Sequence, residues 1–510
     1  MTSQSQSDIF ALLSNPHTHG NPRGGVKRVD THISALFLAG ERVFKLKRAV
    51  RLPFLDFSTV EQRHAACLAE LAVNRRTAPG IYLDVVAVTC EADGKLALGG
   101  QGSAVDWVVV MKRFDDSQLL DRLADEGKLT TDHMTELAAT LARFHDGAEP
   151  RPRWGGEGGL RHTIDTNAVC FAQAMPSTFD PVAAGKVTEG SLAWLVRLAP
   201  LLDARRVTGL VRLCHGDLHL GNICLIDGQI TPFDGIEFND DFACIDVFYD
   251  LAFLLMDLRA RGLEALASAL FNRYLELRPD IEGLAALPLF LSLRAAIRAH
   301  VAATMARQEG AAEGLRALAL DYLAQAEAYL RPPPPRLLAV GGLSGSGKSR
   351  LGRDVAPALG AAPGAVVLRS DVIRKRLMGV EPETRLAAHG YSSEMTDRTY
   401  QALLDDAERA LTAGHSVVAD AVFARPEQRQ AIEAVARRLG VPFDGLWLQA
   451  DPELMRQRIE TRRANASDAT AEVLEQQLAY DLGAMAWPRI DASGPKAETL
   501  ANAKAALRLC

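Results

Sequence analysis

Residues 342–349 read GLSGSGKS, and this stretch decides the fold of the C-terminal part of the chain. It matches the pattern GxxxxGK[ST], with Gly342, Gly347, Lys348 and Ser349 at the defining positions. The apolar run LLAV precedes the loop and a helical pattern follows it, which is the strand–loop–helix context that the motif requires. Glycines at these positions let backbone N–H groups curl around phosphate oxygens. We therefore predict a P-loop that binds the phosphates of a nucleoside triphosphate.

The side chains of the loop have different expected partners. Lys348 is predicted to reach the β- and γ-phosphates, and Ser349 is predicted to ligate Mg²⁺. The other predicted nucleotide-binding positions of the loop are Gly342, Ser344, Gly345, Ser346 and Gly347.

Two acidic residues are expected near this loop. Asp371 follows one strand-like segment and Asp420 ends the next. Ligands of open α/β sheets bind beyond the carboxyl ends of the strands, so both acids should face the P-loop crevice. A carboxylate there can accept a hydroxyl proton or organise Mg²⁺. Strands alternate with helices throughout this part, which predicts an α/β domain with a parallel sheet of strands at about 337–341, 365–369, 416–420, 443–448 and 489–491.

Arginines supply the positive charge that phosphoryl transfer needs. Arg458, Arg462 and Arg463 lie on and just after a predicted helix. Mobile arginines can stabilise the charge of a phosphoryl group during transfer. Arg374 and Arg429 follow the two acids on predicted helices, where they can clamp an acceptor phosphate.

The segments RSDVIRKRL (369–377) and HSVVADAVFARPEQR (415–429), with the arginine-rich segment after them, resemble the small P-loop kinases. That group includes polynucleotide kinase, zeta toxin and gluconate kinase. The resemblance covers about residues 336–510 and implies phosphotransfer to a hydroxyl group. Acceptors in the group range from sugars to nucleic-acid ends, so the resemblance names no acceptor.

This resemblance also assigns roles to residues. It implies that Asp371 deprotonates the acceptor hydroxyl, and that Arg458 and Arg462 touch the donor phosphates. We predict Asp371, Lys348 and Arg458 as catalytic residues and Asp420 as a metal ligand.

The clearest domain boundary is RPPPPR at residues 331–336. Consecutive prolines lack N–H donors and favour a stiff polyproline II spacer. We predict an N-terminal extension over 1–24, a first domain over 25–330, a proline linker over 331–336 and a P-loop domain over 337–510. Within the first domain, strand-like stretches precede helical patterns, which is a bilobal α+β outline with helices at about 59–76, 131–146, 190–205, 246–275 and 284–330.

Residues 215–222 read HGDLHLGN, and residues 233–235 read FDG. Kinase-like phosphotransfer needs an Asp that accepts the proton of the attacking hydroxyl, an Asn five residues later that holds Mg²⁺, and a second Asp that holds Mg²⁺ between the phosphates. Asp217, Asn222 and Asp234 fit these roles in that order. The apolar stretch between Asn222 and Asp234 predicts a hairpin with the two metal ligands at its ends.

This constellation resembles the aminoglycoside phosphotransferase family, a branch of the protein-kinase-like fold that also contains choline, homoserine and sugar kinases. The resemblance covers about residues 25–330. It implies that Asp250 braces the catalytic loop. It also places the acceptor on the helical lobe, where Glu237, Arg294 and Arg298 are candidate contacts.

The family resemblance further implies a strand lysine that pairs with a helix glutamate. The strand VFKLK offers Lys45, with Lys47 as the alternative on the same face of the strand. Glu70 is the predicted helix partner, and Glu61 is the alternative. The turn between the first two strands reads VDTHIS rather than GxGxxG, so the donor can be ATP or GTP.

The bulk composition limits the class of protein. Apolar residues make up 48% and charged residues 24% of 510, as in a soluble globular protein. The net charge of −6 argues against nucleic acid or an anionic membrane as a partner. Seven scattered cysteines without a CxxC fit a reducing compartment, and no uninterrupted apolar run approaches the ~20 residues of a membrane helix. A cytoplasmic location is therefore expected.

The leading prediction is a bifunctional enzyme with two Mg²⁺-dependent sites. Each site would transfer the γ-phosphoryl group of ATP or GTP to a hydroxyl of a small molecule such as a sugar. One alternative is a single active kinase with a regulatory nucleotide-binding domain. Another is phosphorylation of nucleic-acid ends by the C-terminal half. The sequence predicts neither the acceptors nor the oligomeric state.

Overall fold

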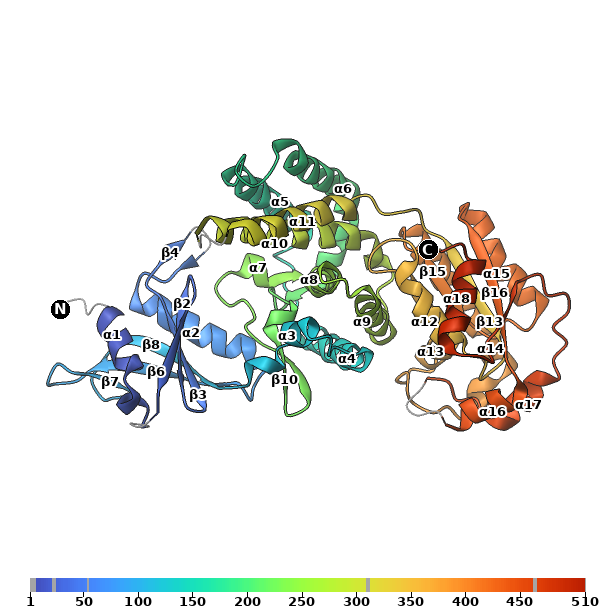
Figure 1. Cartoon of the computed structure of the whole chain (residues 1–510), viewed down its shortest axis with the longest axis horizontal. Coiled ribbons are helices and arrows are strands. Elements are labelled where there is room, and N and C mark those ends of the chain that lie inside the picture. The colour runs from blue at the N-terminus through green and yellow to red at the C-terminus, as the bar shows by residue number, and fades with distance from the viewer. Residues whose placement is uncertain (1–5, 21–23, 53–54, 309–311, 462–465, 510) are drawn as a thin grey trace. The chain divides into compact units, whose positions relative to one another are not determined.

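The structure is a computed structural model that describes residues 6–20, 24–52, 55–308, 312–461 and 466–509 (Figure 1). The chain forms two compact units. The first unit comprises Met1–Leu129, Arg143–Gly159 and Leu201–Leu254, and the second comprises Thr130–Ala142, Leu160–Pro200 and Leu255–Cys510.

The first unit is built on a six-stranded antiparallel sheet with the order β1-β2-β3-β8-β6-β7. Successive side chains of a strand point to opposite faces, so Phe44 packs toward α1 while Val43 packs toward α2. Lys45 has the parity of Val43, which directs it to the α2 face of the sheet. These elements are α1 (Gln6–Ser14), β1 (Val26–Asp30), β2 (Ser34–Ala39), β3 (Arg42–Lys47), α2 (Val60–Asn74), β6 (Tyr82–Cys90), β7 (Leu96–Leu98) and β8 (Ser103–Lys112).

Short elements complete the first unit and carry its motifs. The predicted hairpin after Asn222 is present as β10 and β11, and β9 ends just before the HGDLHLGN segment. The short elements are η1 (Pro16–His19), β4 (Arg51–Leu52), β5 (Leu55–Asp56), η2 (Asp116–Gln118), α3 (Leu120–Asp125), β9 (Val211–Leu213), η3 (Leu220–Asn222), β10 (Ile223–Ile226), β11 (Gln229–Pro232), α7 (Asp240–Ala243) and β12 (Cys244–Asp246).

Long helices make up most of the remaining first half of the chain. The helical pattern at 246–275 forms two helices, because α8 ends where the N–H groups of Gly262 and Leu263 bond back to carbonyls of the last turn. Helix α5 lies where the sequence indicated no helix. The helices are α4 (Thr131–Gly147), α5 (Gly156–Gln173), α6 (Pro181–Val207), α8 (Val247–Ala260), α9 (Glu264–Leu277), η4 (Glu282–Ala286), α10 (Leu287–Gln308) and α11 (Ala312–Tyr329).

One segment, Glu282–Arg307, has the length and apolar composition of a membrane span, although the sequence pattern suggested none. Within its most apolar window, 72% is buried inside the fold. Helix α10, which forms most of this segment, packs along α11 as a core helix.

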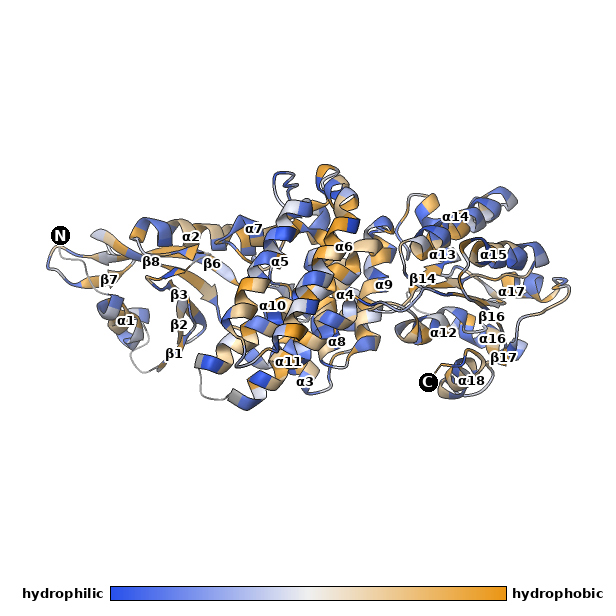
Figure 2. Cartoon of the chain, turned by 90° about the horizontal axis from the view of Figure 1, so that it is seen from above, coloured by the Kyte–Doolittle hydropathy of each residue, from blue (hydrophilic) through white to orange (hydrophobic). Residues whose placement is uncertain are grey.

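The C-terminal part of the second unit is a five-stranded parallel sheet with the order β14-β15-β13-β16-β17. Figure 2 shows α13, α14 and α15 on one face of this sheet and α12 and α18 on the other. Strands covered on both faces are apolar throughout, which explains the continuous run LLAV in β13. The predicted α/β class with a parallel sheet is therefore confirmed.

The elements of this part are β13 (Leu337–Gly342), α12 (Lys348–Val355), η5 (Ala356–Ala358), β14 (Val366–Arg369), α13 (Ser370–Leu377), η6 (Ala388–Tyr391), α14 (Ser393–Thr412), β15 (Val417–Asp420), α15 (Pro426–Leu439), β16 (Phe443–Gln449), α16 (Pro452–Glu460), α17 (Ala471–Leu478), β17 (Arg489–Asp491) and α18 (Lys496–Ala506).

Candidate active sites

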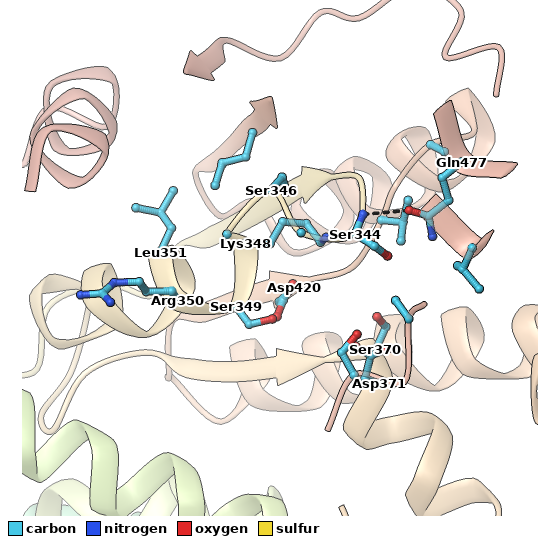
Figure 3. A pocket seen from close by; sticks show the side chains of 18 of the residues that line it. Ser344, Ser346, Lys348, Ser349, Arg350, Leu351, Ser370, Asp371, Asp420 and Gln477 are labelled. Carbon is cyan, nitrogen blue, oxygen red and sulfur yellow. Dashed lines mark hydrogen bonds between the residues drawn. The ribbon is translucent and has the colours of Figure 1, made fainter. Parts of the chain in front are cut away.

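The P-loop joins the carboxyl end of β13 to the N-terminus of α12. At Gly345 the backbone φ is +83°, and a Cβ there would lie 2.6 Å from the carbonyl oxygen of Met455 on α16. A glycine is therefore required where the loop passes this helix. The N–H of Ser344 donates to Oε1 of Gln477 at 2.8 Å (Figure 3), so a side chain of α17 also holds the loop.

The loop lines a pocket of about 900 Å³ at the carboxyl ends of β13, β14 and β15. Parallel strands deliver residues that are far apart in sequence to one edge of the sheet. Gly342, the last residue of β13, does not line the pocket. The predicted site residues that do are Ser344, Gly345, Ser346, Gly347, Lys348, Ser349, Asp371, Asp420 and Arg458.

Asp420 and Ser349 lie side by side in this pocket (Figure 3). The Asp420 side chain is nearly fully buried, and this burial raises its pKa, while Lys348, Arg369 and the Ser349 hydroxyl act in the opposite direction. Nε of Arg369 lies 3.8 Å from Oδ2 of Asp420. Hydroxyl and carboxylate oxygens are hard donors of the kind that Mg²⁺ prefers, so this pair fits a magnesium ion.

Asp371 enters the same pocket from the first turn of α13, and its side chain points toward the pocket in Figure 3. Arg374 follows one turn later and also lines the pocket. Its guanidinium donates to the carbonyl of Gly390 at 2.9 Å and stands 5.0 Å from the centre of the Tyr391 ring. An acid and a cation from α13 therefore line the same pocket as the P-loop lysine.

The arginines predicted to bind phosphate groups differ in their contacts. Arg458 donates to the carbonyl of Ala492 at 2.8 Å and approaches that of Gly345 at 3.5 Å, so it touches the P-loop itself. Arg462 lies outside the described residues. Arg429 is buried and donates to four backbone carbonyls, which commits it to holding loops and leaves it no part in clamping an acceptor phosphate.

A buried ion cluster forms the core of the first unit's site. Oε1 of Glu70 lies 2.7 Å from Nζ of Lys45, and Oε2 lies 2.7 Å from Nζ of Lys47. The Lys45 ammonium also contacts Oδ1 of Asp234 at 2.7 Å. Burial alone would raise the pKa of Glu70, but the two lysines outweigh it and lower the pKa to about 2. The alternative partner, Glu61, is exposed in the first turn of α2.

Lys47 has a second carboxylate partner, Glu237, at 2.5 Å. Glu237 is buried in this ion pair, so it is not placed as a surface contact for an acceptor. Of the other acceptor candidates, Arg294 is buried and Arg298 stands 5.7 Å from the centre of an aromatic ring.

Two residues that hydrogen-bond to the FDG segment were not predicted from the sequence. Oδ1 of Asn74 accepts the N–H of Gly235 at 2.7 Å, and the Tyr82 hydroxyl accepts the N–H of Asp234 at 3.1 Å. Asn74 follows Glu70 by four residues, so both lie on one face of α2, and this spacing was the available signal. Together they hold the backbone of the FDG segment.

Asp217 and Asn222 are joined within the HGDLHLGN segment. Nδ2 of Asn222 donates to the Asp217 side chain at 2.9 Å and to its backbone carbonyl at 3.0 Å. Nδ1 of His219 accepts the N–H of Gly221, so Nε2 carries the proton and faces the Asp217 carboxylate at 3.4 Å. With 40% of its side chain exposed, Asp217 is open to a solute.

Asp250 holds the backbone of the HGDLHLGN segment by hydrogen bonds. Its two carboxylate oxygens accept the N–H groups of His215 at 3.1 Å and Gly216 at 2.9 Å, and His145 contacts it at 3.2 Å. At Gly216 the φ is +84° and a Cβ would lie 2.8 Å from the Phe242 carbonyl, so glycine is required. Burial lowers the pKa of His215, which favours its neutral form.

Comparison with known proteins identifies both parts of the chain. Residues 54–287 match the model of the phosphotransferase enzyme family, and residues 337–481 match the model of an AAA domain. Over 502 residues the chain is 30% identical to the uncharacterized protein Rv2004c of Mycobacterium tuberculosis (strain ATCC 25618 / H37Rv), covering 93% of this chain and 94% of that protein. The chain belongs to the same family as this mycobacterial protein. This chain thus joins a phosphotransferase domain to a P-loop kinase-like domain, which confirms both predicted resemblances.

Solved structures resemble parts of the chain. The apo form of a thermostable mutant of aminoglycoside phosphotransferase APH(4)-Ia covers 64% of the chain and 98% of its own length, with 14% identity and a TM-score of 0.40. A gluconokinase from Sinorhizobium meliloti 1021 covers 34% of the chain and 92% of its own length, with 21% identity and a TM-score of 0.26.

Proposed function

We propose that the protein is a bifunctional phosphotransferase that transfers the γ-phosphoryl group of ATP to hydroxyl groups of small molecules at two separate sites. The observation that carries this proposal is that each motif brings a lysine and carboxylates together. Lys348 lines one pocket with Asp371 and Asp420, and Lys45 contacts Asp234 in the first unit, where Asn222 also donates to the Asp217 carboxylate.

At the P-loop site, Asp371 is the residue suited to accept the proton of the acceptor hydroxyl. Lys348 and Arg458 flank the loop, where they can balance the charge of the phosphates. Ser349 and Asp420 would hold Mg²⁺, which when bound neutralises charge on the β- and γ-phosphate oxygens.

At the first site, Asp217 takes the part of the proton acceptor. The His219 N–H at 3.4 Å and the Asn222 amide at 2.9 Å both face its carboxylate, and they orient it toward an incoming hydroxyl. Lys45 is held between Glu70 and Asp234, so its ammonium stays in place for the donor phosphates. Asn222 and Asp234 fit a magnesium ion by their oxygen donors.

The acceptors are inferred from the chemistry of the pockets. At the P-loop site the buried Arg374 faces the pocket beside Asp371, which suits a small hydroxylated acceptor that carries an anionic group. The net charge of −6 disfavours nucleic acid as the acceptor. Free cysteines scattered over the described chain fit a reducing compartment, and we place the protein in the cytoplasm.

A product-mapping experiment tests the proposal. Purified wild type, Asp217→Asn, Lys348→Ala and the double variant are incubated with γ-labelled ATP, Mg²⁺ and a metabolite extract. We expect each single variant to lose a different labelled product and the double variant to lose both. Unchanged products in both single variants would refute the proposal. Loss in only one variant would favour a single kinase with a regulatory nucleotide-binding domain.

A further inference from the structure

Helix α9, which lies within the phosphotransferase-family match, covers the outer edge of the P-loop sheet within the second unit. Nδ2 of the buried Asn272 donates to the Ala365 carbonyl at 3.1 Å, and its Oδ1 accepts the N–H of Val367 at 2.7 Å. Strand β14 lies at the edge of the sheet, so these two backbone groups have no neighbouring strand to pair with. The single side-chain amide of Asn272 supplies a partner for both of them. The contact is specific and buried.

One turn further along α9, Glu276 reaches the end of the same strand. Its Oε1 accepts from Nη1 of Arg369 at 3.1 Å, and its Oε2 accepts from Nη1 of Arg273 at 3.0 Å. Arg369 is the last residue of β14 and is 93% buried, since its exposed fraction is 7%. The same guanidinium faces Asp420 at 3.8 Å. Arg369 therefore stands between a carboxylate of α9 and the carboxylate predicted to ligate metal in the P-loop pocket.

We propose that Glu276 is a positioning residue of the P-loop site. Helix α9, which lies within the phosphotransferase-family match, would then help to set the geometry of the P-loop site. Two carboxylates compete for one buried guanidinium. Glu276 makes the hydrogen bond, which keeps Arg369 at 3.8 Å from Asp420 and leaves the Asp420 oxygens available to Ser349 and to a metal ion. Without the Glu276 charge, Arg369 would move from its 3.8 Å ion pair with Asp420 to a direct hydrogen bond with it, because a buried guanidinium needs a partner.

This inference rests on the function proposed for the P-loop site, and its test separates the two. The full-length variants are Glu276→Gln, Arg369→Gln and their combination, with Glu282→Gln as the control. Glu282 lies on η4 and pairs with Arg409 of α14 at 2.5 Å, so it belongs to the same contact region without reaching the pocket. Affinity for a non-hydrolysable ATP analogue is measured calorimetrically with EDTA and with Mg²⁺, beside kcat and KM of the Lys348-dependent reaction.

We expect Glu276→Gln to keep its affinity in EDTA but to lose most of the gain in affinity that Mg²⁺ gives wild type. Its kcat should fall about tenfold with little change in acceptor KM, since the interaction that is lost acts on the reacting end of the pocket. Glu282→Gln should match wild type. In the Arg369→Gln background, Glu276→Gln should add no further loss, as expected for a residue that acts through Arg369.

The inference is overturned if Glu276→Gln and Glu282→Gln behave alike, or if Glu276→Gln causes the same loss whether or not Arg369 is present. The fitted number of bound nucleotides per chain reports the folded fraction of each variant, so unfolding is not mistaken for loss of positioning. If wild type shows no Lys348-dependent transfer, the proposed function fails, and the Mg²⁺-dependent binding still decides the role of Glu276.

Discussion

Glu70 pairs with two ammonium groups at the first site, those of the buried Lys47 and the partly buried Lys45. Lys45 and Lys47 share its two carboxylate oxygens at 2.7 Å each, and its side chain is 0% exposed. A buried charge without a partner is costly, whereas a shared carboxylate holds both lysines in fixed positions. The placement of Lys45 toward Asp234 therefore depends on a residue that need not touch a substrate.

Removing this carboxylate should destabilise the first unit. We predict that Glu70→Ala lowers the free energy of unfolding by roughly 3–5 kcal/mol, because two buried lysines lose their common partner. Denaturant unfolding measures the change. Glu61→Ala, at an exposed position of the same helix, should shift it by no more than about 0.5 kcal/mol. Equal effects of the two substitutions would show that Glu70 does not carry this charge balance.

At the scale of elements, η4 contacts the P-loop sheet region through a buried histidine. His415, two residues before β15, faces the carbonyl oxygen of Leu284 of η4 with Nε2 at 3.0 Å. Burial lowers the pKa of His415 to about 4, only partly offset by this hydrogen bond, so the ring is neutral in the folded chain. His300 on α10 has a pKa lowered by burial to about 4 as well.

These histidines make the stability of the second unit depend on pH. The unfolded pKa of His is about 6.5, so the full contribution is present above that pH and is lost as the pH falls from about 6.5 to 4. Each histidine should contribute a slope of up to about 1.4 kcal/mol per pH unit within that window. Urea unfolding between pH 4 and 7.5 measures it. His415→Gln should flatten the slope, and a slope equal to that of wild type would contradict the assignment.

The whole molecule is more than two modules joined by prolines. Residues 331–336 lie in neither helix nor strand. Yet the second compact unit contains α9, α10 and α11 together with the whole P-loop sheet. Within it, Asn272 bonds β14 and Glu282 pairs with Arg409. The sheet of the P-loop domain is thus covered at one edge by a helix from the phosphotransferase-family match.

Two nucleotide sites per chain should be countable in solution. We predict that calorimetric titration with a non-hydrolysable ATP analogue and Mg²⁺ gives two bound nucleotides per wild-type chain. Lys348→Ala and Lys45→Ala should each reduce this number to one, because each removes the lysine that we propose to bind the phosphates at a single site. A wild-type value of one, or the loss of both sites from one substitution, would contradict two separate sites.

The sequence alone determined the two local motifs and the class of both domains. The motifs GLSGSGKS and HGDLHLGN with FDG can be recognised from the short spacings between their residues, because a tight loop or a hairpin is specified by neighbouring residues. The alternation of strands and helices predicted the parallel sheet for the same reason, because each element has its own periodicity. Even so, α5 was missed because its first turn reads GEGG and glycine disfavours a helix. The break between α8 and α9 was missed because it is only three residues long.

Only the tertiary structure decided which charges meet. Lys47 pairs with Glu237 across 190 residues, and Arg369 pairs with Glu276 across 93. It also committed Arg429 to backbone carbonyls rather than to a ligand. Side chains so far apart in the chain share no periodic pattern. The sequence also does not distinguish a polar residue that faces solvent from one that contacts a buried partner. The tertiary fold sets the burial and geometry of each side chain, and these determine whether it faces solvent or a buried partner.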